Sequence, residues 1–410
     1  MADNQIPEKL SKKLDRVKEL ANYCFSCGKC QIVCPTSQLG IFSPKTFIHK
    51  YVTEGYEDLD KFITEEKLFN CLTCEQCAIY CPMATEDEGV IFAEIIQGLR
   101  EYGYNQGLLK DELSLGRTHD GIMQLYPKIQ SDSELKTNKM DFIKDDPALK
   151  TKEEGDLAYF IGCASLLEDV FFEYNIKHRD VPRAVVTLLN EAGIEPVVLE
   201  TKCCGHDNYW VGDAETAKKL AQYNVDLYHK AGVKTIIVEC AEGYRMWKYD
   251  YPDLVENCDF EVKHFSEYVI ENKVLESLEQ VFPVEAKVTF HDPCRMGRLG
   301  GHLYEPAREI LKNLPGIELV ELQHIKDDAN CCGVSTFRSC NSDTKRIREN
   351  RINEAIETGA SYLITTCPKC ITHFSCFLSE VDDDGNERPE KSQIKIMDLA
   401  TFIAKVLQRI

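Results

Sequence analysis

Eight cysteines near the amino terminus constrain the fold of this 410-residue chain more than any other feature. They form two runs of the pattern C-x2-C-x2-C-x3-C-P, made by Cys24, Cys27, Cys30, Cys34 and Pro35, and by Cys71, Cys74, Cys77, Cys81 and Pro82. Such short spacings let one turn of backbone present three thiolates to a [4Fe–4S] cluster, and the fourth ligand usually comes from the other run. We therefore predict two cubane clusters, one held by Cys24, Cys27, Cys30 and Cys81, the other by Cys71, Cys74, Cys77 and Cys34.

Zinc is the alternative metal for these runs, but zinc sites usually combine pairs of ligands separated by a longer loop. The net charge of −20 argues against non-specific binding to nucleic acid or to anionic lipid. Twenty cysteines in a long chain, most of them in tight clusters, indicate metal ligation in a reducing compartment rather than disulfides. We see no signal peptide and no apolar run that could cross a membrane, so we expect a cytoplasmic protein. The alternative is a peripheral position on the inner membrane face, through a partner subunit.

The distribution of apolar and polar residues along the chain predicts its domains. Residues 1–105 carry the two runs among apolar residues at helical spacing, which predicts an α-helical ferredoxin domain. Residues 106–156 are mostly polar and predict a surface connector. From 157 onward apolar runs alternate with amphipathic stretches, which predicts parallel α/β units. The expected strands are 157–163, 194–200, 233–240, 286–294, 317–324 and 361–367, and the expected helices are 181–193, 213–231, 305–316 and 343–358.

The α/β part is an internal repeat, with a first lobe at 157–280 and a second lobe at 281–410. The matching positions are Cys163 with Cys294, Cys203-Cys204-Gly205 with Cys331-Cys332-Gly333, and Cys240 with Cys367. We therefore predict an α+β multidomain fold, in which the helical domain precedes two Rossmann-like α/β lobes related by pseudo-twofold symmetry. Because ligands collect beyond the carboxyl ends of parallel strands, each cysteine set should converge on one rim.

The second lobe offers five thiols, from Cys294, Cys331, Cys332, Cys367 and Cys370. Adjacent cysteines cannot both reach one corner of a compact cube without strain, so five ligands point to an open, distorted iron–sulfur assembly. The first lobe departs from this pattern, because Gly243 stands where a fifth cysteine should be. Its four thiols, from Cys163, Cys203, Cys204 and Cys240, predict either a further cluster or a vestigial lobe that shapes its neighbour.

The cysteine pattern C-x36-CCG-x33-C-x2-C resembles the CCG cysteine-rich domain of heterodisulfide reductases. Two ferredoxin runs ahead of two CCG lobes are similar to the architecture of the D subunit of that family, over essentially the whole chain. Related members include the K subunit of the sulfite-reduction membrane complex. The resemblance implies a non-cubane [4Fe–4S] cluster, held by the five cysteines of the second lobe, at which a disulfide is cleaved.

By the same resemblance the substrate is the coenzyme M–coenzyme B heterodisulfide or a related disulfide. The expected partners are small-molecule disulfides and thiols and an electron-donating subunit, either a membrane cytochrome b or a soluble flavin or iron–sulfur protein. The alternative function is electron transfer alone, as in iron–sulfur subunits of glycerol-3-phosphate, glycolate or lactate dehydrogenases. The glycines at 297–301 do not match a dinucleotide-binding motif, so we predict no flavin or nicotinamide site.

Beyond the cluster ligands, His206 and Lys369 are the weak candidates for catalytic residues, as a proton donor and as a cation near the cluster. His291, Asp292, Arg295 and Arg298 are also close in sequence to ligands, but a satisfied polar group at a strand end explains each at least as well. Cys258, Cys340 and Cys376 fit no motif, and we interpret them as core or surface thiols.

Overall fold

The computed structural model describes residues 6–85, 88–109, 118–132, 134–278, 285–334, 340–381 and 385–409. The chain forms two compact units. Unit 1 comprises Met1–Lys128 with two later segments, Gly205–Ala217 and Gly333–Ile347, and unit 2 comprises Ile129–Cys204, Lys218–Cys332 and Arg348–Ile410. Each later segment of unit 1 begins directly after a cysteine pair, so sequence order alone does not delimit the units.

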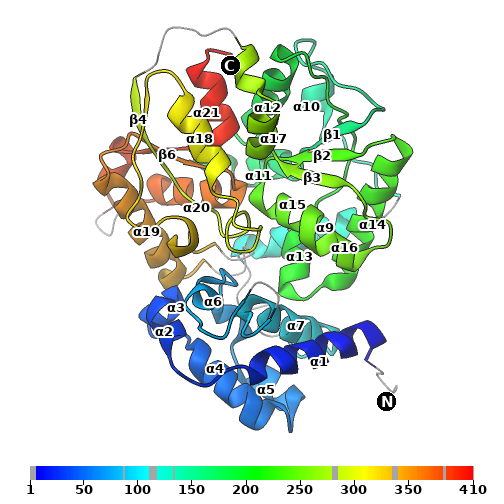
Figure 1. Cartoon of the computed structure of the whole chain (residues 1–410), viewed down its shortest axis with the longest axis vertical. Coiled ribbons are helices and arrows are strands. Elements are labelled where there is room, and N and C mark those ends of the chain that lie inside the picture. Colours follow the sequence, from blue (N-terminus) through cyan, green and yellow to red (C-terminus); the bar gives the residue numbers. More distant parts are fainter. Residues whose placement is uncertain are drawn as a thin grey trace. The chain divides into compact units, whose positions relative to one another are not determined.

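Unit 1 is helical among its described residues (Figure 1). Its helices are α1 (Glu8–Asn22), α2 (Lys29–Val33), α3 (Pro35–Gln38), α4 (Pro44–Lys50), α5 (Leu59–Glu65), α6 (Gln76–Ile79), α7 (Phe92–Asn105) and α13 (His206–Val211). In α1, Leu10, Leu14 and Val17 are buried on one face that packs against α7. The two helices approach closely at Gly98, where a Cβ atom would lie 2.6 Å from Cγ2 of Val17. This core holds the loops that carry the first eight cysteines.

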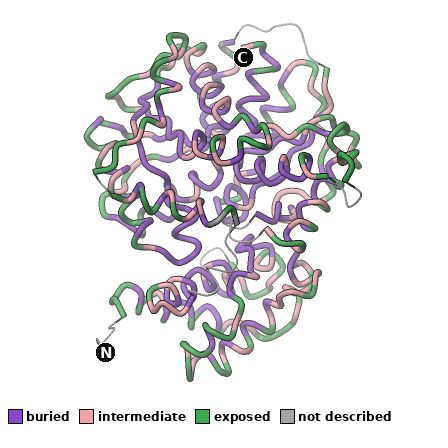
Figure 2. The backbone as a smooth tube through the Cα atoms, turned by 180° about the vertical axis from the view of Figure 1, so that it is seen from behind, coloured by how far each residue is buried: buried purple, intermediate pink, exposed green. Residues whose placement is uncertain are grey.

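Unit 2 contains two parallel sheets, one in each lobe. The first sheet has the order β1-β2-β3, with β1 Leu157–Phe160, β2 Thr235–Val238 and β3 Glu261–His264. The second has the order β5-β4-β6-β7, with β4 Ala286–Phe290, β5 Ile317–Leu319, β6 Tyr362–Thr365 and β7 Lys395–Asp398. Most residues of β1, β2 and β6 are buried, as expected of parallel strands covered on both faces (Figure 2).

Helices from both lobes lie between the two sheets of unit 2 (Figure 1). They are α12 (Asp180–Glu191) and α17 (Phe265–Glu271) from the first lobe, and α18 (Glu305–Asn313) and α21 (Leu399–Val406) from the second. Helix α12 packs against α21, and α17 packs against α18. Since α12 and α18 occupy matching places in the repeat, as do α17 and α21, the two contacts are equivalent. The predicted two-lobed arrangement of parallel α/β units is thereby confirmed.

The remaining helices surround the sheets or belong to the connector. They are α9 (Ile122–Gln130), α10 (Asp141–Lys144), α11 (Ala164–Val170), α14 (Ala214–Lys230), α15 (Ala241–Arg245), α16 (Tyr251–Leu254), α19 (Ser342–Glu357) and α20 (Pro368–Ser379). Among the residues that the structure describes, no helix is long and apolar enough to cross a membrane.

One predicted strand, at 194–200, does not form. It is reduced to isolated bridges at Val197, which pairs with Ala158 of β1. Pro196 has no backbone N–H to donate to a neighbouring strand, so the ladder cannot extend through it. The matching segment of the second lobe has no proline in this place and forms β5.

Candidate functional site

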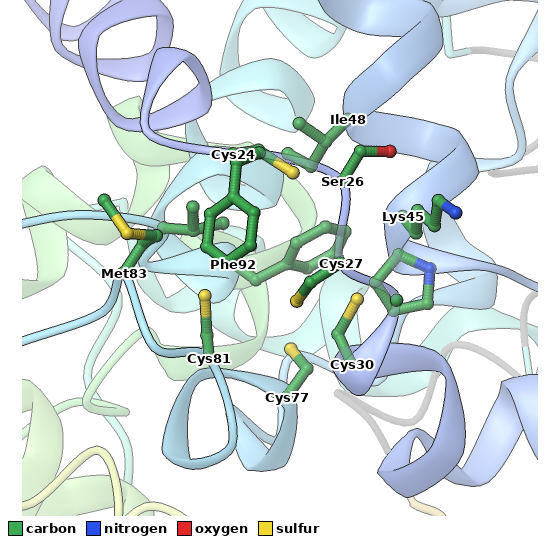
Figure 3. Close-up of a pocket in the computed structure, with 14 residues that line it drawn as sticks. Cys24, Ser26, Cys27, Cys30, Lys45, Ile48, Cys77, Cys81, Met83 and Phe92 are labelled. Atoms are coloured by element: carbon green, nitrogen blue, oxygen red, sulfur yellow. The ribbon is translucent and has the colours of Figure 1, made fainter.

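The first predicted cluster set lines one cavity in unit 1. Cys24, Cys27, Cys30 and Cys81 border it together with Cys77, and the rest of the wall includes Met83, Val90 and Phe92 (Figure 3). Burial, then the neighbouring thiols of Cys24, Cys81 and Cys27, raise the pKa of Cys30 to about 11. Thiolates packed this closely in an apolar wall need a positive metal charge in place of their protons. The donor set therefore fits an iron–sulfur cluster.

The second predicted set lines a neighbouring cavity. Cys34, Cys71, Cys74 and Cys77 border it, next to Phe42 and Phe92. Burial raises the pKa of Cys77 well above its ordinary value, and the charges of Glu75, Cys71, Cys74 and Cys34 add to the effect. Cys77 borders both cavities, but the thiols whose charges most raise its pKa, those of Cys71, Cys74 and Cys34, all belong to the second set. These surroundings are consistent with a fourth ligand supplied to each cluster by the other run, which stays a prediction.

Two charged residues that the sequence analysis missed hold these loops. Glu75 is buried, with Oε1 accepting the N–H of Phe92 at 2.8 Å and Oε2 that of Ala93 at 2.5 Å. It thereby binds the first N–H groups of α7, where a helix favours negative charge. The sequence contains a hint of this role, because Glu75 lies between the ligand cysteines Cys74 and Cys77. A carboxylate there adds negative charge to a site that is already negative, so it needs a structural reason. Arg100 donates to the carbonyls of Leu68 and Cys71, three residues before and at the first ligand of the second run.

Replacing Glu75 by glutamine should destabilise unit 1 and raise the potential of the nearer cluster. The variant loses the charge that binds the start of α7, at a cost of about 1–2 kcal/mol in the free energy of unfolding. Removing a negative charge beside Cys77 also makes an added electron easier to accommodate. Denaturant unfolding and an EPR-monitored redox titration measure the two effects. The exposed Glu57→Gln variant is the matched control and should change neither; equal behaviour of the two variants would refute the role of Glu75.

The five cysteines of the second lobe come together in unit 2. The Sγ atoms of Cys332 and Cys370 are 3.1 Å apart, and Cys331, Cys367 and Cys294 act on the same thiol group. Hydrogen bonds from Cys331 and Cys370 lower the pKa of Cys332 to about 6. Cys367 is the N-cap residue of α20, which also carries Cys370 in its first turn. The junction of strand β6 and helix α20 thus places the thiols of Cys367 and Cys370 next to the pair Cys331-Cys332.

The turn after Cys294 is built on glycine. The N–H of Leu299 donates to the carbonyl of Cys294 at 2.9 Å, and that of Gly300 donates to the carbonyl of Gly297. A Cβ atom at Gly300 would lie 2.4 Å from the carbonyl oxygens of Arg295 and Met296. The glycines at 297–301 therefore let the backbone fold tightly beside a cysteine. This tight turn explains why glycines are present here although they do not form a dinucleotide-binding motif.

The four cysteines of the first lobe also converge. The hydrogen bond that the Cys204 thiol donates to Cys203 is the largest cause that raises the pKa of Cys204, followed by burial and by the charges of Cys203, Cys163 and Cys240. Cys163 and Cys240 begin α11 and α15, and the Sγ atom of Cys240 accepts from the N–H of Gly243 at 3.5 Å. A Cβ atom at Gly243 would lie 3.0 Å from Val238 Cγ1, so the position of the missing cysteine is tightly enclosed.

The connector contributes to this first-lobe site, which the sequence analysis did not foresee. The Nζ atom of Lys139 donates to the carbonyl of Gly162 at 2.8 Å. Burial lowers the pKa of Lys139, while the charges of Cys203, Cys163 and Glu200 act in the opposite direction. Glu200 in turn accepts the N–H groups of Lys139 and Met140. A cation from a segment predicted to lie over the surface thus stands beside the first-lobe thiols.

The cysteine sets of the two lobes are neighbours. The N–H of Ala241 donates to the carbonyl of Thr366, which joins the residue directly after Cys240 to the residue directly before Cys367. After burial, the charge of Cys367 is the largest cause that raises the pKa of Cys240. A buried ion pair spans the same place, with Lys369 Nζ 2.7 Å from Glu242 Oε2. Lys369, a weak catalytic candidate, therefore lies between the two sets with its charge paired.

The other polar candidates have different surroundings. His206 belongs to unit 1, where it begins α13 and its Nδ1 lies 3.4 Å from Asp207 Oδ1. Asp292 makes a two-pronged ion pair with Arg308, at 2.7 and 2.8 Å. Arg298 donates to the carbonyls of Asp327 and Ala329, just before the second-lobe cysteine pair. Asp292 and Arg298 thus have structural roles.

Arg295 and His291 are the polar candidates nearest to the second-lobe thiols. An Nη1 atom of Arg295 lies 3.5 Å from Cys294 Sγ. A ring nitrogen of His291 lies within 4.8 Å of the Sγ atoms of Cys332 and Cys370. The cysteines outside the motifs are Cys258 and Cys340, which are half-buried, and Cys376, which is buried on α20 with its Sγ atom 3.7 Å from Glu380.

Comparison with known proteins agrees with this arrangement. The 4Fe-4S dicluster domain matches residues 16–86, and the family called Cysteine-rich domain matches residues 157–246 and 288–375. The D subunit of the dihydromethanophenazine:CoB–CoM heterodisulfide reductase of Methanosarcina barkeri is 25% identical, over 94% of this chain and 93% of that protein.

Two further relatives are longer proteins. An EtfAB:quinone oxidoreductase of Syntrophomonas wolfei is 24% identical over 94% of this chain and 58% of its own length. The probable iron-sulfur-binding oxidoreductase FadF of Bacillus subtilis is 27% identical over 84% of this chain and 47% of its own length. The chain is thus an iron–sulfur oxidoreductase that resembles the D subunit of heterodisulfide reductase, with a 4Fe-4S dicluster domain followed by two cysteine-rich domains.

Proposed function

We propose that this chain reduces a disulfide at an iron–sulfur assembly held by Cys294, Cys331, Cys332, Cys367 and Cys370. The observation that carries the proposal is the convergence of these five thiols in unit 2, with Cys332 and Cys370 Sγ only 3.1 Å apart. Five donors exceed what a compact four-iron cube uses, as expected of an open assembly. When bound, the assembly would supply single electrons to the sulfur–sulfur bond. By similarity to the D subunits, the substrate is the coenzyme M–coenzyme B heterodisulfide or a related mixed disulfide.

The reaction takes two electrons and two protons and converts one disulfide, R–S–S–R′, into two thiols, RSH and R′SH. The electrons come from a partner protein, either a cytochrome b or a flavin or iron–sulfur protein, and enter at the two cubanes of unit 1. The name of the Methanosarcina relative, which is one subunit of a larger enzyme, supports a partner of this kind. Arg295, beside Cys294, supplies a fixed positive charge where product thiolates would form.

The test uses the full chain, prepared without oxygen, with reduced viologen dye as electron donor. We expect dye oxidation that depends on the disulfide and yields two thiols for every two electrons. Adding one product thiol to the oxidised protein should give a new paramagnetic signal, distinct from those of the cubanes. Normal reduction of the cubanes, with no turnover of heterodisulfide or of other mixed disulfides and no thiol-dependent signal, would contradict the proposal.

Electron relay without bond cleavage is the second candidate. Two observations favour it: the first lobe has Gly243 in place of a fifth cysteine, and relatives include an EtfAB:quinone oxidoreductase. In this case the chain passes electrons between a flavin dehydrogenase subunit and a quinone or other carrier. Rapid oxidation of the reduced chain by a short-chain quinone, together with indifference to disulfides, would support the relay.

A further inference from the structure

A buried histidine lies against the second-lobe thiols, and an arginine determines which of its nitrogens carries the proton. The side chain of His291 is almost wholly buried, and its ring edge meets Phe374. The Nε atom of Arg351 donates to His291 Nδ1 at 3.0 Å. A guanidinium has donors and no acceptor, so Nδ1 must offer a lone pair. With its lone pair on Nδ1 the ring is neutral and carries its proton on Nε2, and burial and the charge of Arg351, which keep the pKa of His291 well below its ordinary value, act in the same direction.

Arg351 is itself held in place. Its Nη1 atom donates to Glu354 Oε2 at 2.7 Å and to the carbonyl of His324 at 2.9 Å. Glu354 also accepts from the backbone N–H of His324 at 2.7 Å, which ties α19 to the segment before the cysteine pair. The backbone of His291 is fixed too, since its N–H donates to the carbonyl of Ile364 and its carbonyl accepts from Thr365 Oγ1. The orientation of the imidazole is therefore determined from both sides.

A histidine beside cysteine ligands can either bind the metal or donate a hydrogen bond, and the tautomer of His291 decides between these two roles. A histidine that binds a metal through one nitrogen normally donates its other N–H to a carboxylate, a carbonyl or water. His291 faces a donor instead, so a neutral ring has no lone pair left for a metal. The ring can still donate one hydrogen bond, through its remaining N–H. One ring nitrogen of His291 lies within 4.8 Å of the Sγ atoms of Cys332 and Cys370.

We propose that His291 is a positioning residue that donates an Nε2–H hydrogen bond to a sulfur atom of the second-lobe assembly. The inference rests on the proposed function, because it requires the assembly to be present. Hydrogen bonds to cluster sulfurs are one of the means by which proteins set reduction potentials. Because the donated bond strengthens as electron density on sulfur grows, His291 favours the reduced state.

The test compares His291→Leu, which removes the donor, with His291→Gln, which keeps a side-chain N–H. We expect the Leu variant to retain its iron and to show a lower midpoint potential for the second-lobe signal in an EPR-monitored titration. The Gln variant should show a smaller shift. The two ferredoxin-type clusters are an internal control in the same sample. His178→Leu is the matched buried control, because the ring of His178 bonds Thr372 Oγ1 at 2.8 Å, and it should not change the potential.

A second measurement needs no variant. In wild-type protein with 15N-labelled histidine, pulsed EPR should show one weak nitrogen coupling and one exchangeable proton that disappears in D2O. A strong coupling of the kind made by a metal-bound nitrogen would overturn the proposal, as would an unchanged potential in a folded, iron-replete Leu variant. Absence of any second-lobe iron in the wild type would instead refute the proposed function, so the two failures are distinguishable.

Discussion

Replacing Cys332 by serine should lower disulfide reduction by at least about 100-fold, the upper range for loss of a residue that merely supports a metal ligand. Cys332 lies at the centre of the second-lobe set: it accepts from Cys370, and its pKa responds to all four other thiols. Its carbonyl also accepts from His373 Nδ1, so the backbone is held in place and the substitution removes little besides the sulfur. Iron analysis should show loss from this assembly alone.

The control for this experiment is Cys258→Ser, which removes a half-buried thiol outside every motif and should leave activity and iron content unchanged. The EPR signals of the ferredoxin-type clusters should be the same in both variants. Full disulfide reduction by Cys332→Ser would contradict the assignment of the reaction to the second lobe.

Replacing Arg100 by methionine should destabilise unit 1 by about 3 kcal/mol or more. The guanidinium is fully buried and donates to the carbonyls of Leu68 at 2.9 Å, Cys71 at 2.7 Å and Trp210 at 2.9 Å. Each buried acceptor left without a donor costs about 1–3 kcal/mol. The loop that begins at Cys71 should loosen as well, so iron should be lost first from the set of Cys34, Cys71, Cys74 and Cys77.

Denaturant unfolding followed by circular dichroism, together with iron analysis, measures both consequences. Arg16→Met is the matched control, since Arg16 is a partly exposed arginine of the same unit whose ion pairs lie at the surface. It should change the free energy of unfolding by less than about 0.5 kcal/mol. Comparable losses in the two variants would show that the buried carbonyls do not depend on Arg100.

Short-range sequence patterns predicted a large part of this molecule. The helix expected at 181–193 forms as α12, because its apolar residues recur with the period of a helix, and the helix expected at 343–358 forms as α19. The strands before Cys240 and Cys367 form as β2 and β6 because continuous apolar runs suit a sheet covered on both faces. The first three cysteines of each run line one cavity in unit 1, because ligand spacing within a run is a local property, whereas the pairing of each run with the last cysteine of the other stays a prediction.

Features that depend on distant residues could not be predicted. Strands β3 and β7 have only four residues each and contain lysine, so their sequences carry no apolar run. The partners of Arg100 lie up to 110 residues away, and no local pattern pairs Lys369 with Glu242 or places Lys139 beside the first-lobe thiols. Such contacts arise when distant segments pack together, and a single sequence does not show which distant segments will meet.

The helices shared between the lobes have a consequence for how such a chain could arise. Val185, Leu188 and Leu189 of α12 are fully buried, and α12 packs against α21 of the other lobe. A polypeptide with only one of these lobes would expose that apolar surface and would need a second molecule to cover it. Gene duplication within one reading frame turns such a homodimer into a monomer, and from then on either half is free to lose a ligand that the other keeps.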